Sequence, residues 1–341
     1  MRTRRALSIA AGAAALALAS LAIASPASAA TLPSGQKITI VDLILADVGP
    51  TGSQMYNVNP ANAASTSVGS VQAPDNIQAI DVADTGLGYA TGHYTEDPQN
   101  PAQEQDWVPV LLVADANTGT YGTVVDIAPV DDEITINQCT GLDLQPNGEI
   151  IVACLDLSDG LLDSYIGVVT PLGAFTPFIS SGENDVEEYY YTALAYNAVT
   201  SELWAFADFD GTGAAFLLDR AAGTQGPPVV LDERVTAADF DRDGQLFVSA
   251  ELFFEGDPGQ FVSALATANT ATGALTIVDP FNVGTNDLYP VWALTVWGAP
   301  GLAATGATGT DMLPIGLGSA LLLLAGAAFI ATARMNRRAA A

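Results

Sequence analysis

The stretch DFDRDG, residues 239–244, has the residue types and spacing that begin a calcium-binding loop. Its carboxylates alternate along the chain at Asp239, Asp241 and Asp243. Alternating carboxylates can face one Ca²⁺ ion, and the glycine that follows suits the sharp turn of such a loop. Phe247 and Ala250 stand where the loop should supply its last oxygen ligands. A hairpin turn is therefore the favoured interpretation, with Ca²⁺ as the alternative, and no other cofactor is expected.

Carboxylates also recur at one position of a repeated strand pattern. The copies are IQAIDV, CTGLDL, YTALAY, VTAADF and VWALTV, and the residues at that position are Asp81, Asp143, Ala195, Asp239 and Thr295. If the five strands surround an axis, the three carboxylates converge and could hold a cation. The favoured alternative is that each carboxylate caps backbone N–H groups of the neighbouring strand.

The residues expected of a hydrolase are scarce. His93, in GHYTED, is the single histidine, and we interpret it as a loop residue without a catalytic role. A general base must reach a nucleophile, and no motif such as GxSxG supplies one. One histidine and two cysteines are also too few for a zinc site.

Cys139 and Cys154 bracket the hairpin CTGLDLQPNGEIIVAC. They face each other if the turn centres between Pro146 and Asn147, whereas a bulge at Gly148 would place them on opposite faces. Export from the cell favours oxidation, so we predict a disulfide that serves stability.

Two hairpin patterns alternate along the chain and position all of these residues. Each middle copy of the inner-strand pattern is followed by a turn and a second strand, as in DRDGQLFVSA. The outer hairpins occupy residues 55–69, 111–125, 166–179, 216–231 and 264–278, and the last four carry turn glycines at Gly119, Gly173, Gly223 and Gly273. A four-stranded unit repeated about every 50 residues is typical of a β-propeller blade.

The two ends of the repeat complement each other. The first outer hairpin has no inner strand before it, and the last inner strand, 291–297, has no outer hairpin after it. The sequence therefore predicts an all-β propeller of about five blades, in which Lys37 to Asp47 joins the two ends into one blade. The alternative is six or seven blades, if Glu96 to Trp107 contains a degenerate unit; its Pro and Gln content favours a loop.

Aromatic residues offer a possible binding surface. Trp107, Trp204, Trp292 and Trp297, with Tyr189, Tyr190 and Tyr191, could stack on sugar rings if they were exposed, but packing between blades is the favoured interpretation. The loop SGENDVEEYYY is long, charged and aromatic, so it is the expected functional surface.

Charge excludes one class of partner. Residues 31–305 contain 37 of the 38 acidic residues of the chain and four basic ones, a net charge of about −33. Nucleic acids and anionic membranes are excluded, because cations are lacking to replace phosphate counterions.

The two termini predict export and anchoring. Residues 1–30 have the arginines, apolar stretch and small-residue end of a signal peptide, followed by a propeller ectodomain at 31–298. Residues 299–311 form a linker, 312–333 an uncharged span long enough for a transmembrane helix, and 334–341 a basic cytoplasmic tail.

The linker contains LAATG, at Leu302, Ala303, Ala304, Thr305 and Gly306. This motif, with the span and basic tail behind it, resembles the sorting signal of sortase-anchored cell-wall proteins of Gram-positive bacteria. The resemblance implies cleavage between Thr305 and Gly306, transfer to peptidoglycan, and membrane contact only through the C-terminal helix before sorting. Ala303 replaces the usual Pro, which leaves the sortase class open. The alternative is a single-pass membrane protein with an extracellular N-terminal domain.

Two functions are consistent with these features. The favoured one is a non-catalytic wall-displayed propeller that binds a polysaccharide, a protein or a cation, as in adhesion. The alternative is an extracellular metal-dependent enzyme of lactonase or lyase type, with carboxylates as acid and base.

Overall fold

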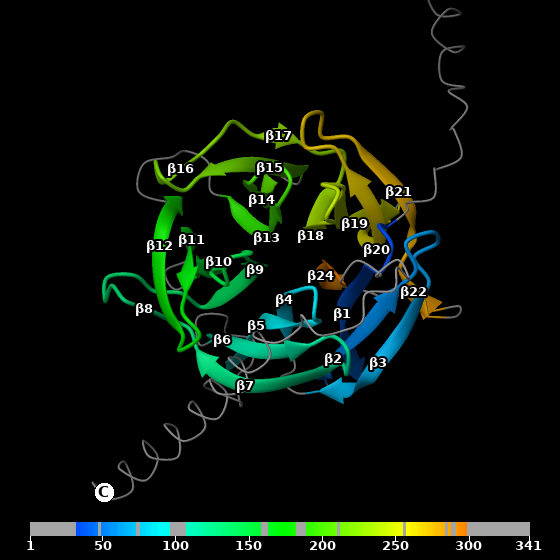
Figure 1. Cartoon of the computed structure of the whole chain (residues 1–341), viewed down its shortest axis with the longest axis horizontal. Coiled ribbons are helices and arrows are strands. Elements are labelled where there is room, and N and C mark those ends of the chain that lie inside the picture. The colour runs from blue at the N-terminus through cyan, green and yellow to red at the C-terminus, as the bar shows by residue number, and fades with distance from the viewer. Residues whose placement is uncertain are drawn as a thin grey trace, which may run out of the picture. The chain divides into compact units, whose positions relative to one another are not determined.

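In the computed structural model, five antiparallel sheets stand around one axis as the blades of a β-propeller (Figure 1). The innermost strands β4, β9, β13, β18 and β24 contact one another in that order, and β24 contacts β4, so the ring closes. The structure describes residues 32–46, 49–72, 76–95, 107–157, 163–181, 189–209, 212–254, 257–283, 286–287 and 291–298. Within these ranges the fold is all-β, and no helix is long and apolar enough to cross a membrane.

Each blade has four main strands, from the axis outwards. Blade 1 consists of β24 (Val291–Trp297), β1 (Lys37–Ala46), β2 (Gly49–Val58) and β3 (Ser65–Gln72). Blade 2 consists of β4 (Ile77–Val82), β5 (Leu87–Thr95), β6 (Trp107–Asp115) and β7 (Thr120–Asp126). Blade 3 consists of β9 (Gln138–Leu144), β10 (Ile150–Asp156), β11 (Asp163–Val169) and β12 (Ala174–Ser181), with β8 (Ala128–Pro129) parallel to β12.

Blade 4 consists of β13 (Tyr190–Asn197), β14 (Glu202–Phe209), β15 (Thr212–Asp219) and β16 (Thr224–Gln225), and β17 (Val229–Val230) also pairs with β15. Blade 5 consists of β18 (Arg234–Phe240), β19 (Leu246–Phe254), β20 (Asp257–Ala268) and β21 (Leu275–Pro280). A separate pair is formed by β22 (Asn282–Val283) and β23 (Asn286–Asp287). The predicted five-bladed ring is therefore confirmed.

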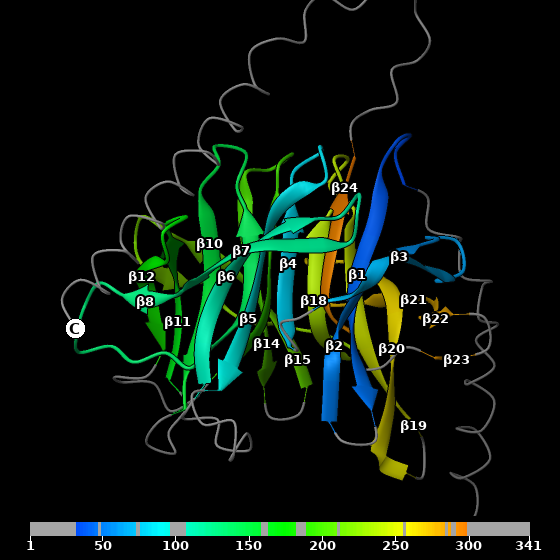
Figure 2. The same cartoon turned by 90° about the horizontal axis from the view of Figure 1, so that it is seen from below.

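Burial explains why inner and outer strands differ in sequence. The inner strand β4 is buried at every residue, because neighbouring blades cover both of its faces, and four of its six residues are apolar. The outer strand β7 is exposed or half-buried throughout. We call the end of the ring where the inner strands begin the start face, at the bottom of Figure 2, and the opposite end the end face.

The predicted closure of the ring is confirmed in blade 1. β1 lies between β24 and β2 and pairs antiparallel with both. Its register with β24 runs from Lys37 opposite Trp297 to Asp42 opposite Val291. Ile38 and Ile40 of β1 are fully buried in a core cluster with Leu294 of β24. The first and last strands thus hold the ring together through both hydrogen bonds and apolar packing.

Every inner strand contains a bulge at the same level, which the sequence pattern did not predict. The register shifts by one residue in each pairing of an inner strand with its neighbour, and the bulged residues are Gln78, Thr140, Thr192, Thr236 and Trp292. Three of them are threonines whose hydroxyls donate to the next blade, to the carbonyls of Tyr191 (2.5 Å), Val235 (2.6 Å) and Val291 (2.8 Å) in turn. The bulge therefore connects blades as well as bending strands.

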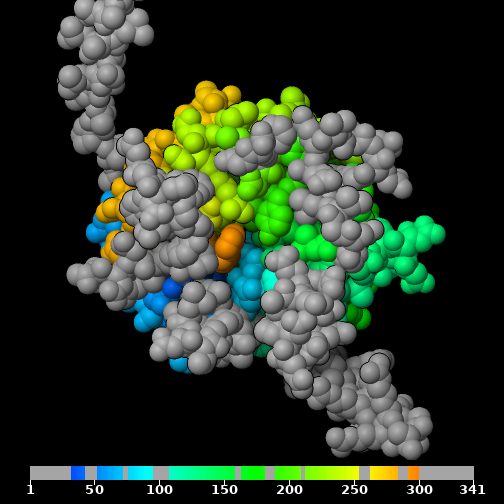
Figure 3. Space-filling model, turned by 180° about the vertical axis from the view of Figure 1, so that it is seen from behind, coloured from blue at the N-terminus to red at the C-terminus, as the bar shows by residue number. Residues whose placement is uncertain are grey.

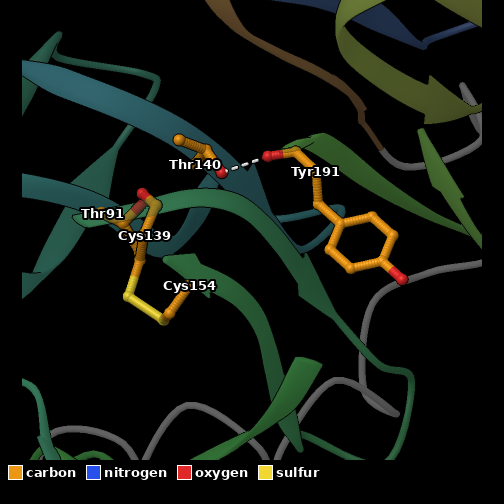
Figure 4. Close-up of a disulfide and its surroundings, with 5 residues drawn as sticks. All are labelled: Thr91, Cys139, Thr140, Cys154 and Tyr191. Atoms are coloured by element: carbon orange, nitrogen blue, oxygen red, sulfur yellow. Dashed lines mark hydrogen bonds between the residues drawn. A yellow bond between two sulfur atoms is a disulfide. The ribbon is translucent and has the colours of Figure 1, made fainter. Parts of the chain in front are cut away.

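The bulge at Thr140 also explains the disulfide. Without it Cys154 would lie opposite Thr140, but the register shift places Cys154 opposite Cys139. The two sulfurs are bonded at 2.00 Å, and the pair is fully buried beside Thr91, whose hydroxyl donates to the Cys139 carbonyl at 2.8 Å (Figure 4). The predicted disulfide is present, and the bulge lies in β9 rather than at Gly148.

The repeated turn glycines have a physical cause. Gly119, Gly173, Gly223 and Gly273 all have positive φ, and each lies against the backbone of the preceding blade. A Cβ at Gly273 would lie 1.8 Å from the Val230 carbonyl oxygen. Blade 1 has Ala63 at the corresponding place, with φ 51°. The turn therefore needs both left-handed backbone and space for a neighbouring blade.

We expect Gly273→Ala to destabilise the protein far more than Gly148→Ala. Both glycines have positive φ, so each substitution costs about 1 kcal/mol of backbone strain. A Cβ at Gly148 would meet no described atom within 4 Å, whereas one at Gly273 meets Val230, which adds about 1–3 kcal/mol of overpacking. Urea unfolding measures both. Equal losses in the two variants would contradict the role assigned to blade contact.

Removal of residues 32–46 should abolish cooperative unfolding. The deletion exposes the edge of β24 and removes Ile38 and Ile40 from the core, so the ring loses its closing strand. Removal of 301–341, which lies beyond the last described strand, is the control and should leave one sharp transition. Calorimetry distinguishes the two, and a normal single transition in the first deletion would refute closure by β1.

Candidate functional site

The space at the propeller axis is almost filled. Residues from all five inner strands line a cavity of about 10 Å³, and six of them are small: Ala79, Gly141, Ala193, Ala237, Ala238 and Ala293. Such a volume holds about one water molecule. At this level of the axis, the described residues therefore leave room for about one water molecule and not for a substrate.

Three carboxylates and a hydroxyl lie two residues further along the inner strands. We call Asp81, Asp143, Asp239 and Thr295 the axial cluster. The backbone N–H of Leu144 donates to Asp81 at 2.6 Å, that of Val296 donates to Asp239 at 2.6 Å, and that of Tyr196 donates to Asp143. In each case the donor belongs to the next blade. The capping arrangement expected from the sequence is thus the one found.

The members of the axial cluster also contact one another. Thr295 Oγ1 lies 2.9 Å from Asp81 Oδ1 and 3.3 Å from Asp239 Oδ2. Asp81 and Asp143 are hydrogen-bonded through their side chains, and Gln145 donates to Asp143. Burial raises the pKa of Asp81 to about 6 and raises the pKa values of Asp143 and Asp239 well above the usual range. These groups hold protons more tightly than ordinary aspartates.

The stretch DFDRDG forms the hairpin turn between β18 and β19. Asp241 Oδ1 accepts hydrogen bonds from the backbone N–H groups of Asp243 (2.9 Å) and Gln245 (2.8 Å), and Gly244 has φ +83°. Asp239 instead bonds to the backbone at the axis. Among the described residues, no group of three or more His, Cys, Asp or Glu side chains is arranged to hold a metal ion.

The interpretation of His93 as a loop residue was wrong. His93 lies within β5 and is only 7% exposed, and its ring stacks on Trp107 with centroids 3.9 Å apart. Trp107 begins β6, so the predicted loop ends one residue earlier. Both strands continue further towards the start face than the sequence pattern indicated. Tyr89, Thr91 and His93 are spaced two residues apart, as residues on one face of a strand are, and this spacing could have placed His93 within β5.

A chain of amide groups fixes the protonation of His93. Gln138 Nε2 donates to Gln78 Oε1 (2.8 Å), and Gln78 Nε2 donates to Asn76 Oδ1 (2.5 Å). Asn76 then turns its amide nitrogen to His93 Nε2, 3.0 Å away, which must accept. Burial lowers the His93 pKa to about 4, so the ring is neutral near pH 7. Its proton is therefore on Nδ1, which is buried and has no partner among the described residues.

A second buried polar group occupies the same position in blade 5. His93 follows Thr91 by two residues and Glu251 follows Ser249 by two, and both hydroxyls donate to a carbonyl of the next blade. Glu251 is fully buried; Arg234 Nη1 donates to its Oε2 at 3.1 Å, while its Oε1 has no partner among the described residues. Arg234 Nε also lies 3.2 Å from Asp208. The sequence pattern did not point to this group, although Arg234 is one of four basic residues in the ectodomain.

The aromatic residues considered for sugar stacking are mostly inside the fold. Tyr189 and Tyr191 are buried and contact Phe216 edge-on, and Trp204 and Trp297 are buried as well. Trp107 and Trp292 are half-buried, and Trp292 lines the axial cavity. Packing was the favoured interpretation and is confirmed for the four buried rings.

Several predicted segments lie outside the described residues. They are the signal peptide, residues 182–188 of the charged loop, the LAATG motif, the span 312–333 and the basic tail.

Figure 3 views the ring from its start face, where the orange end of β24 reaches the surface near the axis.

No family model matches this chain, and the comparison with curated proteins found no match. Among solved structures it is similar to an exo-β-1,3-galactanase from Clostridium thermocellum, with 10% identity, a TM-score of 0.50, and coverage of 71% of this chain and 58% of that one. A candidate 6-phosphogluconolactonase from Bacteroides uniformis has 14% identity, a TM-score of 0.39, and coverage of 72% and 85%. The Dos1 propeller has 11% identity, a TM-score of 0.37, and coverage of 72% and 75%. At these identities the similarity concerns the fold alone: this chain is a β-propeller.

Proposed function

We propose that this protein is anchored to a Gram-positive cell wall and displays a non-catalytic propeller whose start face binds a polysaccharide. The observation that carries the binding proposal is the position of unsatisfied hydrogen-bonding atoms. His93 Nδ1 and Glu251 Oε1 are buried without a partner in the described part of the chain, and both lie at the start-face ends of second strands. Buried polar atoms normally have partners, and because His93 and Glu251 are themselves covered, a water molecule between each atom and the ligand would supply the missing hydrogen bond.

A hydroxyl-rich ligand suits both atoms. His93 Nδ1 offers a proton and Glu251 Oε1 accepts one, and a sugar hydroxyl can both donate and accept. A strongly anionic polymer is disfavoured by the net charge of about −33 on residues 31–305. Trp107, half-buried beside His93, adds an aromatic surface of the kind that packs against sugar rings.

Catalysis is disfavoured by the state of the axial carboxylates. A general acid or base needs a free carboxyl group within reach of substrate, and a cation needs free carboxylate oxygens. Asp81, Asp143 and Asp239 each accept a backbone hydrogen bond from the next blade, and the cavity beside them holds about one water molecule. Their role in joining blades leaves them poorly placed for chemistry.

Anchoring rests on the order of segments in the sequence. LAATG, an uncharged span and an arginine-rich tail follow the propeller in the arrangement typical of sortase substrates. Thr305 would form the bond to peptidoglycan, after which the span no longer belongs to the protein. The propeller would then be held outside the cell by a short segment rich in Gly, Ala and Thr.

We expect Thr305→Ala to move the protein from the cell-wall fraction to the membrane fraction. The substitution removes the residue whose carbonyl a sortase would attack, while the span and tail still retain the chain. Muramidase release followed by immunoblotting measures the wall-linked pool. Thr308→Ala, which lies outside the motif, is the control and should change nothing. An unchanged wall-linked pool in Thr305→Ala would refute the sortase proposal.

Polysaccharide binding should depend on the start face. Residues 31–300 are titrated calorimetrically with neutral wall polysaccharides and, for comparison, with teichoic acid. His93→Phe keeps the stack on Trp107 but loses the Nδ1 donor. Glu251→Gln replaces one of the two carboxylate oxygens by an amide nitrogen, so either the bond to Arg234 or the acceptor for the ligand is lost. Each should weaken binding about tenfold, the effect of one lost hydrogen bond to a buried group.

The control for that titration is Arg220→Gln. Arg220 pairs with Glu149 at 2.8 Å next to an end-face turn, so its loss should leave affinity unchanged. Chelation of divalent cations should also have no effect, since no cofactor is expected. Binding that requires Ca²⁺, or hydrolysis of the polysaccharide, would favour the enzyme instead.

A further inference from the structure

The axial cluster joins four of the five blades at one level. Asp81 comes from blade 2, Asp143 from blade 3, Asp239 from blade 5 and Thr295 from blade 1, whereas Ala195 of blade 4 contributes no polar group. All four polar side chains are at most 9% exposed. Three carboxyl groups therefore share a small buried space in which their charges repel each other.

The hydrogen bonds in this space require at least one proton on a carboxyl group. Backbone N–H groups donate to Asp81 and Asp239, and the one proton of the Thr295 hydroxyl serves either Asp81 at 2.9 Å or Asp239 at 3.3 Å. Asp81 and Asp143 are also bonded directly to each other. Two carboxylates can form such a bond only if one of them is protonated, because an ionised carboxylate has no donor.

Within the described part of the chain, no cation compensates the cluster. The groups that face it are Asp81 from β4, Asp143 from β9 with Gln145 beyond it, the Tyr196 N–H from β13, Asp239 from β18, and Thr295 from β24. In the described structure, none of the hydrogen bonds or ion pairs of these three carboxyl groups involves a Lys, Arg or His side chain. A proton shared between carboxyl groups is therefore what reduces the repulsion among Asp81, Asp143 and Asp239.

We propose that a proton shared within the axial cluster locks the blades together, so that the ring is tightest in mildly acidic surroundings and loosens as the pH rises. Loss of the proton replaces the bond between Asp81 and Asp143 by repulsion between blades 2 and 3. The same repulsion reaches Asp239, which holds blade 5 to blade 1 through Val296. The proposal concerns the ring itself and holds whether or not the start face binds a polysaccharide.

The direction of the pH effect follows from the raised pKa values. Burial raises the pKa of Asp81 to about 6, and those of Asp143 and Asp239 well above their usual range, so the folded protein binds more protons than the unfolded chain above about pH 4. The stability that these groups contribute is fully present below the unfolded pKa and is lost as the pH rises through the folded values. Ion-paired carboxylates, whose pKa is lowered, give the opposite trend.

The test compares the full-length protein with Asp143→Asn, and with Asp84→Asn as the matched control. The amide introduced by Asp143→Asn can donate to Asp81 at any pH, so the bond between blades 2 and 3 persists when the pH is high. Asp84 lies in the exposed turn after β4, and its substitution removes the same charge without touching the cluster. This control separates the cluster from the general repulsion of an acidic chain.

Urea unfolding between pH 5 and 9 provides the measurement. One proton lost on unfolding increases the unfolding constant about tenfold per pH unit. Wild type and Asp84→Asn should show this dependence from pH 5 upwards, until the folded pKa values are passed, and the unfolding constant of Asp143→Asn should rise up to about tenfold less per pH unit. Equal slopes in all three proteins would overturn the proposal.

A second measurement needs no variant. In the folded wild-type protein, NMR of aspartate labelled at the carboxyl carbon should show at least one group titrating at pH 6 or above. If Asp143→Asn does not fold, this titration decides the question alone. Aspartates that all titrate below pH 5 would show that the cluster carries no shared proton.

Discussion

The ring depends on hydrogen bonds that cross from one blade to the next around the axis. A four-stranded sheet cannot bury both faces alone, so each blade is stable only when its neighbours cover it. Apolar packing between blades has no preferred register, whereas a hydroxyl that meets one carbonyl does. The bonds from Thr140 to Tyr191, and from Thr192 and Thr236 onwards, set that register at the level of the bulges. The axial cluster sets it again closer to the end face.

Much of this architecture is readable from the sequence because the repeat is local. Turn glycines such as Gly119 and Gly273, and the five copies of the inner-strand pattern, recur with the blade and predict both the number of blades and the closing strand. Closure of the ring follows because the first outer hairpin lacks an inner strand and the last inner strand, 291–297, lacks an outer hairpin, so the two complete one blade. The orientation of the axial carboxylates also follows, since a strand that faces the axis must bring its polar residue to a neighbour.

The bulges and the start face were beyond sequence reasoning. A bulge is a one-residue difference in pairing, and although three of the five bulged residues are threonines, Gln78 and Trp292 occupy the same position, so residue type alone does not reveal it. The hydrogen-bond chain that ends at His93 comes from two other segments, one with Asn76 and Gln78 and one with Gln138, so no local pattern connects these residues to it. The pairing of Glu251 with Arg234 depends on how β18 and β19 align, and a bulge in β18 alters that alignment by one residue.

Polar residues at the two ends of the ring thus differ in whether the fold itself provides partners for all of their hydrogen-bonding atoms. Towards the end face, Asp241 closes a turn with its own backbone, and the axial carboxylates bond to the next blade, so their hydrogen-bonding capacity is used within the fold. At the start face, His93 and Glu251 are held rigidly by Asn76 and Arg234, and each still keeps one atom without a partner among the residues that the structure describes. Rigid positioning combined with unused hydrogen-bonding capacity is what recognition requires, because a ligand then gains bonds without the cost of ordering the side chains. This difference is why we assign stability to the axis and binding to the start face.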